Sequence, residues 1–154
     1  IGIAGVQGDS TSKARMAGYC KGIEAKGGTY LSGETQYADG VSDKAVTSME
    51  SIIQNHPEGI AIIACNNDDM ALGVYDYYKE KNLKLPVIIG INNSEEMHQK
   101  IMSGEMYGTI DNKMEDQVME ICRLMQAILK KDTGSYQKVW YSTPKAIVKA
   151  EGTE

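Results

Sequence analysis

Polar side chains gather at five points of the sequence, each directly after an apolar run that is typical of a strand. In order, these clusters are Gln7-Gly8-Asp9-Ser10, Gln36-Tyr37, Asn66-Asn67-Asp68, Asn92-Asn93 and Asp111-Asn112. Most members are amides, carboxylates are few, and Arg15 is the nearby cation. Amide and guanidinium groups supply fixed hydrogen-bond donors and acceptors without acid or base chemistry. The clusters therefore favour recognition of a neutral polyol over catalysis.

The third cluster lies in the most informative stretch of the chain, residues 60–73. An unbroken run of apolar and small residues from Ile60 to Cys65 is typical of a strand buried on both faces. The asparagines and aspartates that follow predict a turn and a helix N-cap. In an open parallel sheet, ligands bind outside the carboxyl ends of the strands. We therefore expect Asn67 to face a ligand and Asp68 to brace the turn.

Strand-like and helix-like stretches alternate along the rest of the chain. The expected strands are residues 1–6, 29–35, 60–65, 86–91 and 106–110, with a last extended segment, 139–148, interrupted by Pro144. The expected helices are residues 12–26, 42–55, 68–81, 94–102 and 114–130, with Ser12 capping the first and Ser42 or Asp43 the second. Repeated β-α-β units with short loops predict an α/β fold with three layers, in which a mostly parallel sheet has helices on both faces.

Composition excludes several classes of function. The chain has 154 residues, the usual size of one domain, and a net charge of −5 with acidic and basic residues interspersed. It has no basic stripe to neutralise phosphates, so we expect no nucleic-acid binding. No apolar run has the length of a membrane span. No Cys/His cluster predicts a metal site, no cofactor is expected, and Cys20, Cys65 and Cys122 are expected to be buried free thiols.

Four short motifs, taken together, resemble a known family. They are Gly8 with Arg15 and Gly18, then Asn67-Asp68-x-Met70-Ala71-Leu72-Gly73, then Gly90-x-Asn92, then Gly104 with Thr109-Ile110-x-Asn112. Their order and spacing resemble those of the periplasmic sugar-binding proteins of the ribose- and galactose-binding type. These have the type I periplasmic binding protein fold, which they share with effector domains of the lactose-repressor family. The resemblance covers roughly residues 1–150 and corresponds to the second lobe of such a protein.

The resemblance implies a binding site at the edge of this lobe. In the family, ligand is held in a cleft between two lobes joined by hinge strands, and the lobes close over it. Residues 1–112 would form the second lobe, and residues 113–154 would cross the hinge to a first lobe that this chain lacks. By position, Arg15, Asn67, Asn92 and Asn112 would bind the ligand.

The resemblance also implies a biological role. The chain would be part of the solute-binding component of an ABC transporter, located outside the cytoplasm and acting with a membrane permease. The sequence starts abruptly on a predicted strand, without a leader, which suggests a piece of a longer chain. An effector or sensor domain of a transcriptional regulator or receptor is an alternative with the same fold.

Two positions depart from the family's pattern. Asn92 stands where the family usually has Asp, so a carboxylate that accepts hydroxyl protons is replaced by an amide. Gly40 falls near the position that often carries a stacking aromatic residue, and Tyr37 is the nearest aromatic candidate for that role. These departures leave a modified sugar, another polyol or a different polar ligand open.

An enzymatic alternative rests on Gly8-Asp9-Ser10, which resembles the nucleophile block of the GDS-type esterases. Ser10 would attack an acyl carbon and His98, three residues after Glu95, would be the base. One observation argues against the esterase: His98 falls within a short helix rather than near the end of the domain.

Helix 114–130 predicts self-association, because its apolar stripe lacks the first lobe that it contacts in the family. We expect the isolated chain to self-associate as a homodimer through this helix.

Overall fold

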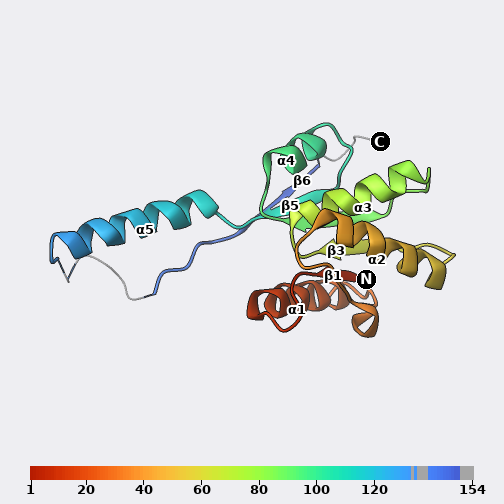
Figure 1. Cartoon of the computed structure of the whole chain (residues 1–154), viewed down its shortest axis with the longest axis horizontal. Coiled ribbons are helices and arrows are strands. Elements are labelled where there is room, and N and C mark those ends of the chain that lie inside the picture. Colours follow the sequence, from red (N-terminus) through yellow and green to blue (C-terminus); the bar gives the residue numbers. More distant parts are fainter. Residues whose placement is uncertain (133, 135–138, 150–154) are drawn as a thin grey trace.

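The computed structural model of the chain describes residues 1–132, 134 and 139–149, and shows a sheet of six strands with helices around it (Figure 1). The strands are β1 (Gly2–Ala4), β2 (Gln36–Tyr37), β3 (Ile62–Cys65), β4 (Val87–Ile91), β5 (Gly108–Asp111) and β6 (Lys145–Val148). Their order in the sheet is β2-β1-β3-β4-β5-β6. The first five strands run parallel, and β6 pairs with β5 in the antiparallel sense.

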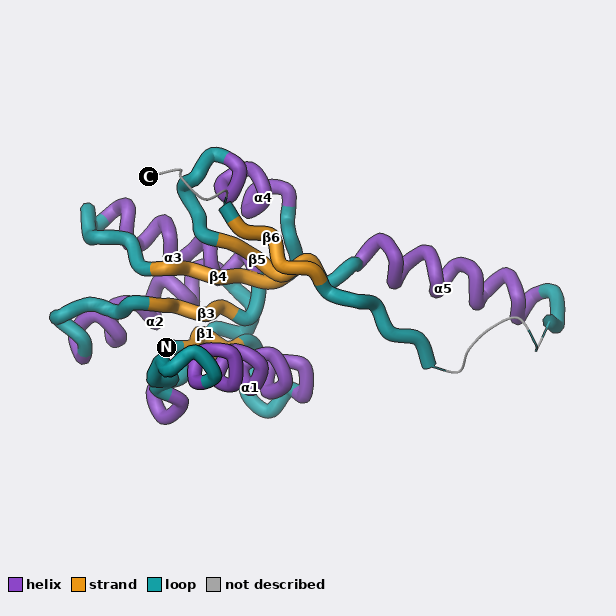
Figure 2. The backbone as a smooth tube through the Cα atoms, turned by 180° about the vertical axis from the view of Figure 1, so that it is seen from behind, coloured by secondary structure: helices purple, strands orange, loops and turns teal. Residues whose placement is uncertain are grey.

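The helices are α1 (Ser10–Glu24), α2 (Ser42–Asn55), α3 (Asp68–Glu80), α4 (Glu95–Met102) and α5 (Met114–Leu129), with a 3-10 turn at Ser32–Glu34. Helix α1 lies on one face of the sheet, and α2 and α3 lie on the other (Figures 1 and 2). The predicted α/β architecture with helices on both faces is therefore confirmed. After β1 the chain moves outward to β2, then returns to β3 on the other side of β1, so a switch point lies between β1 and β3.

The hydrophobic core lies between the sheet and helices α2, α3 and α4. Its fully buried side chains include Met49, Ile63, Met70, Ile88, Met97 and Ile101. Helix α3 approaches α2 closely at Gly73, where a Cβ would lie 2.6 Å from the Ser42 hydroxyl. Among the described residues, no helix is long and apolar enough to cross a membrane.

The structure corrects several predicted elements. Residues 29–35 are not a strand, because Ser32–Glu34 forms a 3-10 turn and the strand is confined to Gln36–Tyr37 at the sheet edge. The last strand begins only at Lys145, directly after Pro144, which lacks the N–H that a paired strand donates. Helix α2 begins at Ser42 with Val41 as its N-cap and no capping side chain. Cys65 is a buried thiol as expected, but Cys122 is exposed.

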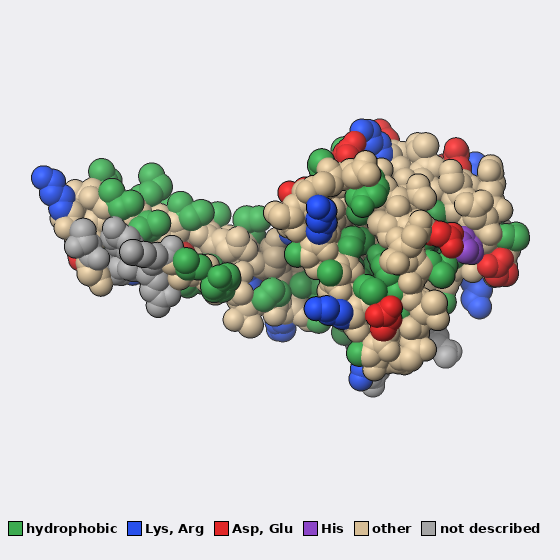
Figure 3. Space-filling view, turned by 90° about the horizontal axis from the view of Figure 1, so that it is seen from below, with side chains coloured by type: hydrophobic (Ala, Val, Ile, Leu, Met, Phe, Trp, Pro, Cys, Tyr) green, Lys and Arg blue, Asp and Glu red, His purple; other side chains and the backbone are tan. Residues whose placement is uncertain are grey.

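Helix α5 extends away from the sheet, as Figures 1 and 2 show. The predicted helix is confirmed, and most of its apolar side chains contact solvent: Met119 is 69% exposed and Leu129 is 82% exposed. Val139, Trp140 and Tyr141, which precede β6, are also exposed. Figure 3 shows hydrophobic side chains along this extension of the molecule. Since α5 contributes little to the core, the sheet and its other helices form the packed unit.

Gly90 in β4 leaves room for a buried carboxylate. A Cβ at Gly90 would overlap the Oδ1 atom of Asp68 and would lie 3.2 Å from the Asp68 Cα. Asp68, the first residue of α3, is only 1% exposed. The missing side chain at position 90 therefore lets the start of α3 pack directly on β4.

We predict that Gly90→Ala lowers the free energy of unfolding by about 2 kcal/mol, because the new methyl group displaces the Asp68 carboxylate. Urea unfolding followed by circular dichroism measures this change. Gly22→Ala is the matched control: nothing lies within 4 Å of a Cβ there, on helix α1. The control is expected to be neutral or stabilising by up to about 1 kcal/mol. Equal stability of Gly90→Ala and the unchanged chain would contradict the close packing.

Candidate functional site

The carboxyl ends of the strands form one edge of the sheet, and all four predicted site residues lie along it. Arg15 lies in the second turn of α1, which follows β1. Asn67 follows β3 and is the N-cap of α3. Asn92 and Asn112 directly follow β4 and β5. The edge is therefore the one that parallel α/β sheets use for ligands.

Arg15 and Asn67 contact the same hollow, at the switch point between β1 and β3. Its volume is about 170 Å³. The residues that line it come from α1, from the loops after β1, β2 and β3, and from α3: Gly5, Val6, Asp9, Thr11, Ser12, Arg15, Asp39, Gly40, Asn66, Asn67 and Met70. Sequence reasoning did not single out Asp39, whose carboxylate pairs with Lys44 at this hollow. Tyr37, the candidate stacking aromatic, is not among the lining residues.

Asn67 is held in a defined orientation by two hydrogen bonds. Its Oδ1 accepts from the backbone N–H of Met70 at 2.9 Å, which caps α3, and its Nδ2 donates to the carbonyl of Gly40 at 2.9 Å. A carboxamide offers two lone pairs and two N–H groups, so each atom retains capacity for a further bond. Asn67 can therefore cap the helix and bind a ligand at the same time.

Asn66 and Ser12 form a buried hydrogen bond beneath this hollow. Asn66 is 4% exposed and its Nδ2 donates to the Ser12 hydroxyl at 2.7 Å. The same hydroxyl accepts from the backbone N–H of Gly5 at 3.0 Å. The prediction that Ser12 caps the first helix is wrong: Asp9 is the N-cap and accepts from the N–H of Ser12 at 2.6 Å. The hydrogen bond between Asn66 and Ser12 joins the start of α1 to the loop after β3, and residues of both line the hollow.

Asn66 also holds the side chain of Arg15 in place. Its Nη1 donates to the carbonyl of Asn66 at 2.8 Å and lies 3.5 Å from the Asn66 Oδ1. The guanidinium has five N–H donors in a planar fork, so the other nitrogens remain able to donate toward the hollow. The contact with a backbone carbonyl thus orients the cation without neutralising it.

Asn92 and Asn112 form a second pair. The Nδ2 of Asn112 donates to the Oδ1 of Asn92 at 3.1 Å. Asn92 contacts a separate hollow of about 200 Å³, lined also by Asn93, Asp111, Lys113, Met114, Glu115 and Asp116. Asn92 has φ 131° and Asn93 has φ 59°, a region that favours glycine and in which Asn is the best tolerated alternative. The structure therefore brings the four residues together as two pairs rather than as one cluster.

Asp68 braces the turn, as predicted, and does so deep in the protein. Its Oδ1 accepts from the hydroxyl of Thr109 at 2.6 Å, and its Oδ2 accepts from the N–H of Ser94 at 2.7 Å. Burial raises the pKa of this carboxyl, while the two hydrogen bonds oppose that shift. The side chain links the start of α3 with β5 and the N-terminus of α4.

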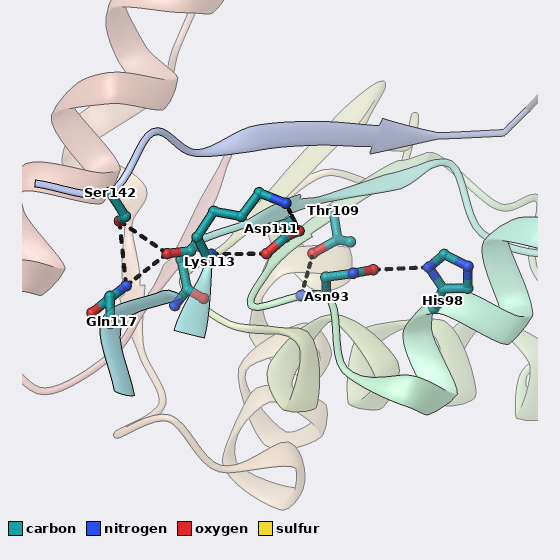
Figure 4. Close-up of polar contacts among 8 residues, drawn as sticks. Asn93, His98, Thr109, Asp111, Lys113, Gln117 and Ser142 are labelled. Atoms are coloured by element: carbon teal, nitrogen blue, oxygen red, sulfur yellow. Dashed lines mark hydrogen bonds and ion pairs between the residues drawn. The ribbon is translucent and has the colours of Figure 1, made fainter. Parts of the chain in front are cut away.

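The chain crosses between the sheet and α5 twice, and polar contacts tie the two crossings together (Figure 4). The carbonyl of Asn112 accepts from the Nε2 of Gln117 at 2.6 Å and from the hydroxyl of Ser142 at 3.2 Å. Lys113 and Asp111 form an ion pair of 2.9 Å. The outgoing segment and the returning segment are thereby joined where they leave the sheet.

The structure does not bring the residues of the esterase hypothesis together. Ser10 begins α1, whereas His98 lies on α4 at the other end of the sheet (Figures 1 and 2). The Nδ1 of His98 lies 3.0 Å from the Oδ1 of Asn93 (Figure 4). Among the described residues, no group of His, Cys, Asp and Glu is arranged to hold a metal ion.

A comparison of the sequence with models of protein families assigns the family of the chain. The model of the family described as periplasmic binding protein domain matches residues 1–133. The chain therefore belongs to the periplasmic binding protein domain family. A comparison with curated protein sequences finds none that matches the chain.

Solved structures with the same fold include binding proteins and regulators. A periplasmic solute binding protein of an ABC transporter from Actinobacillus succinogenes, with bound D-allose, has a TM-score of 0.86 and 21% identity over 96% of this chain and 52% of its own. The Caulobacter myo-inositol binding protein has a TM-score of 0.81 and 27% identity, over 96% and 50%. The Escherichia coli transcriptional repressor ascG has a TM-score of 0.78 and 16% identity, over 96% and 53%. The chain thus spans about half the length of these proteins.

His56, at the end of α2 and away from the candidate site, lies between two carboxylates. The Nε2 of His56 lies 2.6 Å from the Oε2 of Glu34, and its Nδ1 lies 3.2 Å from the Oε1 of Glu58. The carboxylate of Glu34, and then that of Glu58, raise the pKa of His56 above its ordinary value of 6.5. The protonated imidazole donates to both carboxylates, so it joins the 3-10 turn to the loop before β3.

We predict that the free energy of unfolding falls as the pH rises from the ordinary histidine pKa of 6.5 through the raised pKa of folded His56. The folded pKa is raised, so the contribution is complete below the unfolded pKa and is lost above the folded one. In His56→Gln this step should vanish, whereas His98→Gln, which leaves both carboxylate contacts intact, should retain it. Urea unfolding at a series of pH values is the measurement, and a step that persists in His56→Gln would refute the assignment.

Proposed function

We propose that this chain is one lobe of a non-enzymatic solute-binding protein that binds a sugar or sugar-like polar molecule in a cleft between two lobes. The observation that carries the proposal is the convergence of Arg15 and Asn67 on one hollow at the switch point of the sheet. The family of the chain supports it, as do similar structures bound to D-allose and myo-inositol. Arg15, Asn67, Asn92 and Asn112 are the proposed ligand-binding residues.

The chemistry of the hollow suits hydroxyl-rich ligands. Arg15 supplies N–H donors for ring and hydroxyl oxygens, and Asn67 supplies one further donor and one further acceptor. Asp9 and Asp39 add carboxylates that accept hydroxyl protons. A wall with both donors and acceptors fits a hydroxyl group, which donates one proton and accepts through two lone pairs.

The second pair of residues extends the same wall toward the hinge. The Oδ1 of Asn92 accepts from Asn112, so the two amide N–H groups and one lone pair of this oxygen remain toward a ligand. A carboxylate at this position would instead accept hydroxyl protons. We propose that this difference selects a ligand with an acceptor oxygen at the hinge end, such as a ring, carbonyl or modified hydroxyl oxygen.

The missing partner of this lobe is proposed to be a first lobe, which the chain does not contain. Residues 1–112 would form the ligand-binding lobe, and residues 113–154 would include the part that crosses the hinge; 133, 135–138 and 150–154 of this range lie outside the described residues. The exposed apolar side chains of α5 and of residues 139–141 support this division, because much of their surface remains in contact with solvent in the described part of the chain. A cleft with both walls would exclude water from the ligand.

The biological context that we propose is the solute-binding component of an ABC transporter, outside the cytoplasm, with a membrane permease as partner. The similar protein from Actinobacillus succinogenes supports this context. An effector domain of a transcriptional regulator is the alternative, and the similar repressor ascG and the regulator CelR, which was solved with cellobiose, support it. Both contexts use the same cleft for a small polar ligand.

The proposal predicts weak binding by this chain alone and tighter binding by a two-lobed protein that contains it, because the second wall adds hydrogen bonds and excludes water. Isothermal calorimetry against D-allose, myo-inositol, ribose, galactose and cellobiose measures both affinities. In the two-lobed protein, Arg15→Met should weaken binding about tenfold, since a hydrogen bond to a charged group is lost.

The control for that experiment is Lys13→Met, which removes an exposed cation from the same helix and should leave the affinity unchanged. Binding of no sugar or polyol by the two-lobed protein would contradict the proposed function. Tight binding by this chain alone would contradict the half-cleft, and hydrolysis of p-nitrophenyl acetate that is lost in Ser10→Ala would favour the esterase instead.

Without a first lobe, we predict that the chain dimerises through helix α5, because dimerisation removes the exposed stripe of Val118, Ile121 and Met125 from water. Light scattering over a concentration series should show a mass that rises toward a dimer. Ile121→Glu should remain monomeric, since it places a charge within the stripe. Leu83→Glu, which changes an exposed apolar residue after α3, is the control and should still dimerise. A monodisperse monomer at high concentration would count against this prediction.

A further inference from the structure

Tyr19 of helix α1 reaches the ends of two strands that carry proposed ligand-binding residues. It lies one helical turn after Arg15, on the side of α1 that faces the sheet. Its hydroxyl oxygen lies 3.3 Å from the carbonyl oxygen of Cys65 and 3.0 Å from that of Gly90. Cys65 is the last residue of β3, and Gly90 is the penultimate residue of β4. One hydroxyl thus donates toward a carbonyl in each of two neighbouring strands.

These contacts lie where the pairing of the two strands ends. The paired residues of β3 and β4 are Ile62 with Val87, Ile63 with Ile88, and Ala64 with Ile89. Cys65 and Gly90 lie one residue beyond the last pair of β3 with β4, although β1 pairs with Cys65 and β5 pairs with Gly90. Tyr19 therefore bridges β3 and β4 next to the last residues that these two strands pair with one another.

Each of the two carbonyls lies two residues before a proposed ligand-binding asparagine. Cys65 precedes Asn67 by two positions, and Gly90 precedes Asn92 by two positions. The Nη1 of Arg15, on the same face of α1, holds the intervening carbonyl of Asn66 at 2.8 Å. Helix α1 thus contacts the backbone of β3, of β4 and of the loop after β3 through side chains one turn apart.

We propose that Tyr19 is a positioning residue of the binding site, whose hydroxyl sets the separation between Asn67 and Asn92. The inference rests on the proposed function, because those two asparagines belong to the two pairs that form the ligand wall. A phenylalanine of the same shape would fill the same space but would leave the two carbonyls unjoined. The hydroxyl, rather than the ring, therefore carries the positioning role.

The protonation state of Tyr19 suits this role. Burial raises the pKa of the hydroxyl, and the thiol of Cys65 and the carboxyl of Asp68 act in the same direction. The group therefore keeps its proton and remains a donor to both carbonyls at physiological pH. A donor that does not titrate gives the site a fixed geometry over the range in which a sugar is bound.

The test is Tyr19→Phe in the full 154-residue chain, with Tyr30→Phe as the matched control. The hydroxyl of Tyr30 lies 3.5 Å from the Sδ of Met16, so the control removes a hydroxyl that also contacts α1 but touches neither site loop. NMR titration with the sugar panel gives the affinity, and amide hydrogen exchange reports the loops. The amide of Asn66 bonds to the Ile3 carbonyl and that of Asn92 bonds to the Ile110 carbonyl, so both are informative probes.

Tyr19→Phe should weaken sugar binding about fivefold. It should also speed exchange at the amides of residues 66–68 and 91–93, while Tyr30→Phe should change neither. Unchanged affinity in Tyr19→Phe, unchanged exchange at these amides, or faster exchange over the whole sheet would overturn the inference. If the unchanged chain binds no sugar even as part of a two-lobed protein, the proposed function fails. The exchange data alone then decide whether Tyr19 holds the two loops.

Discussion

The buried carboxylate of Asp68 is the constraint on which the architecture of the site edge depends. A buried carboxylate is costly unless its oxygens accept hydrogen bonds, and here Thr109 and Ser94 supply them from two further elements. Space for it exists because Gly90 has no side chain. The start of α3, strand β5 and the start of α4 are therefore held in one arrangement. This arrangement also fixes the positions of the asparagines that lie next to these elements.

The site edge itself is built mainly from contacts between side chains and backbone. Asn67 caps α3 and holds the carbonyl of Gly40, and Arg15 holds the carbonyl of Asn66. Such contacts fix the direction of each polar group before any ligand arrives, which lowers the ordering cost of binding. Amides and one cation that are already oriented suit a small hydroxyl-rich molecule. Such a ligand binds through many weak hydrogen bonds, and each costs less to form when its protein group is already in place.

Much of the fold followed from the sequence because hydrophobic periodicity distinguishes strands from helices. A strand is present within the run from Ile60 to Cys65, at Ile62–Cys65, and helix α5 is present where its stripe predicted it, although that stripe is exposed. The role of Asn67 as an N-cap was also predictable, since capping is a local property. Residues 29–35 were mispredicted because an edge strand is so short that Ser32 and Gly33 decide its conformation as a turn.

Sequence patterns could not predict contacts between residues that lie far apart in the chain. The bond of Ser12 to Asn66 joins residues 54 positions apart, and nothing local distinguishes it from a capping serine. The separation of the four site residues into two pairs depends on how far apart β3 and β5 lie in the sheet, which strand order determines. The contact of Tyr19 with Gly90 spans 71 positions and likewise needs the assembled sheet.

The antiparallel strand β6 has a consequence for how this lobe can be made. It pairs with β5 through Thr109 with Ile147 and Ile110 with Ala146, after the chain has travelled out along α5 and returned. During synthesis, β5 would therefore remain an unprotected edge strand until nearly the whole chain had emerged. A fragment ending at residue 112 would keep that edge open permanently. The lobe is thus contiguous in space but not in sequence, and β6 replaces β5 as the edge strand of the described sheet.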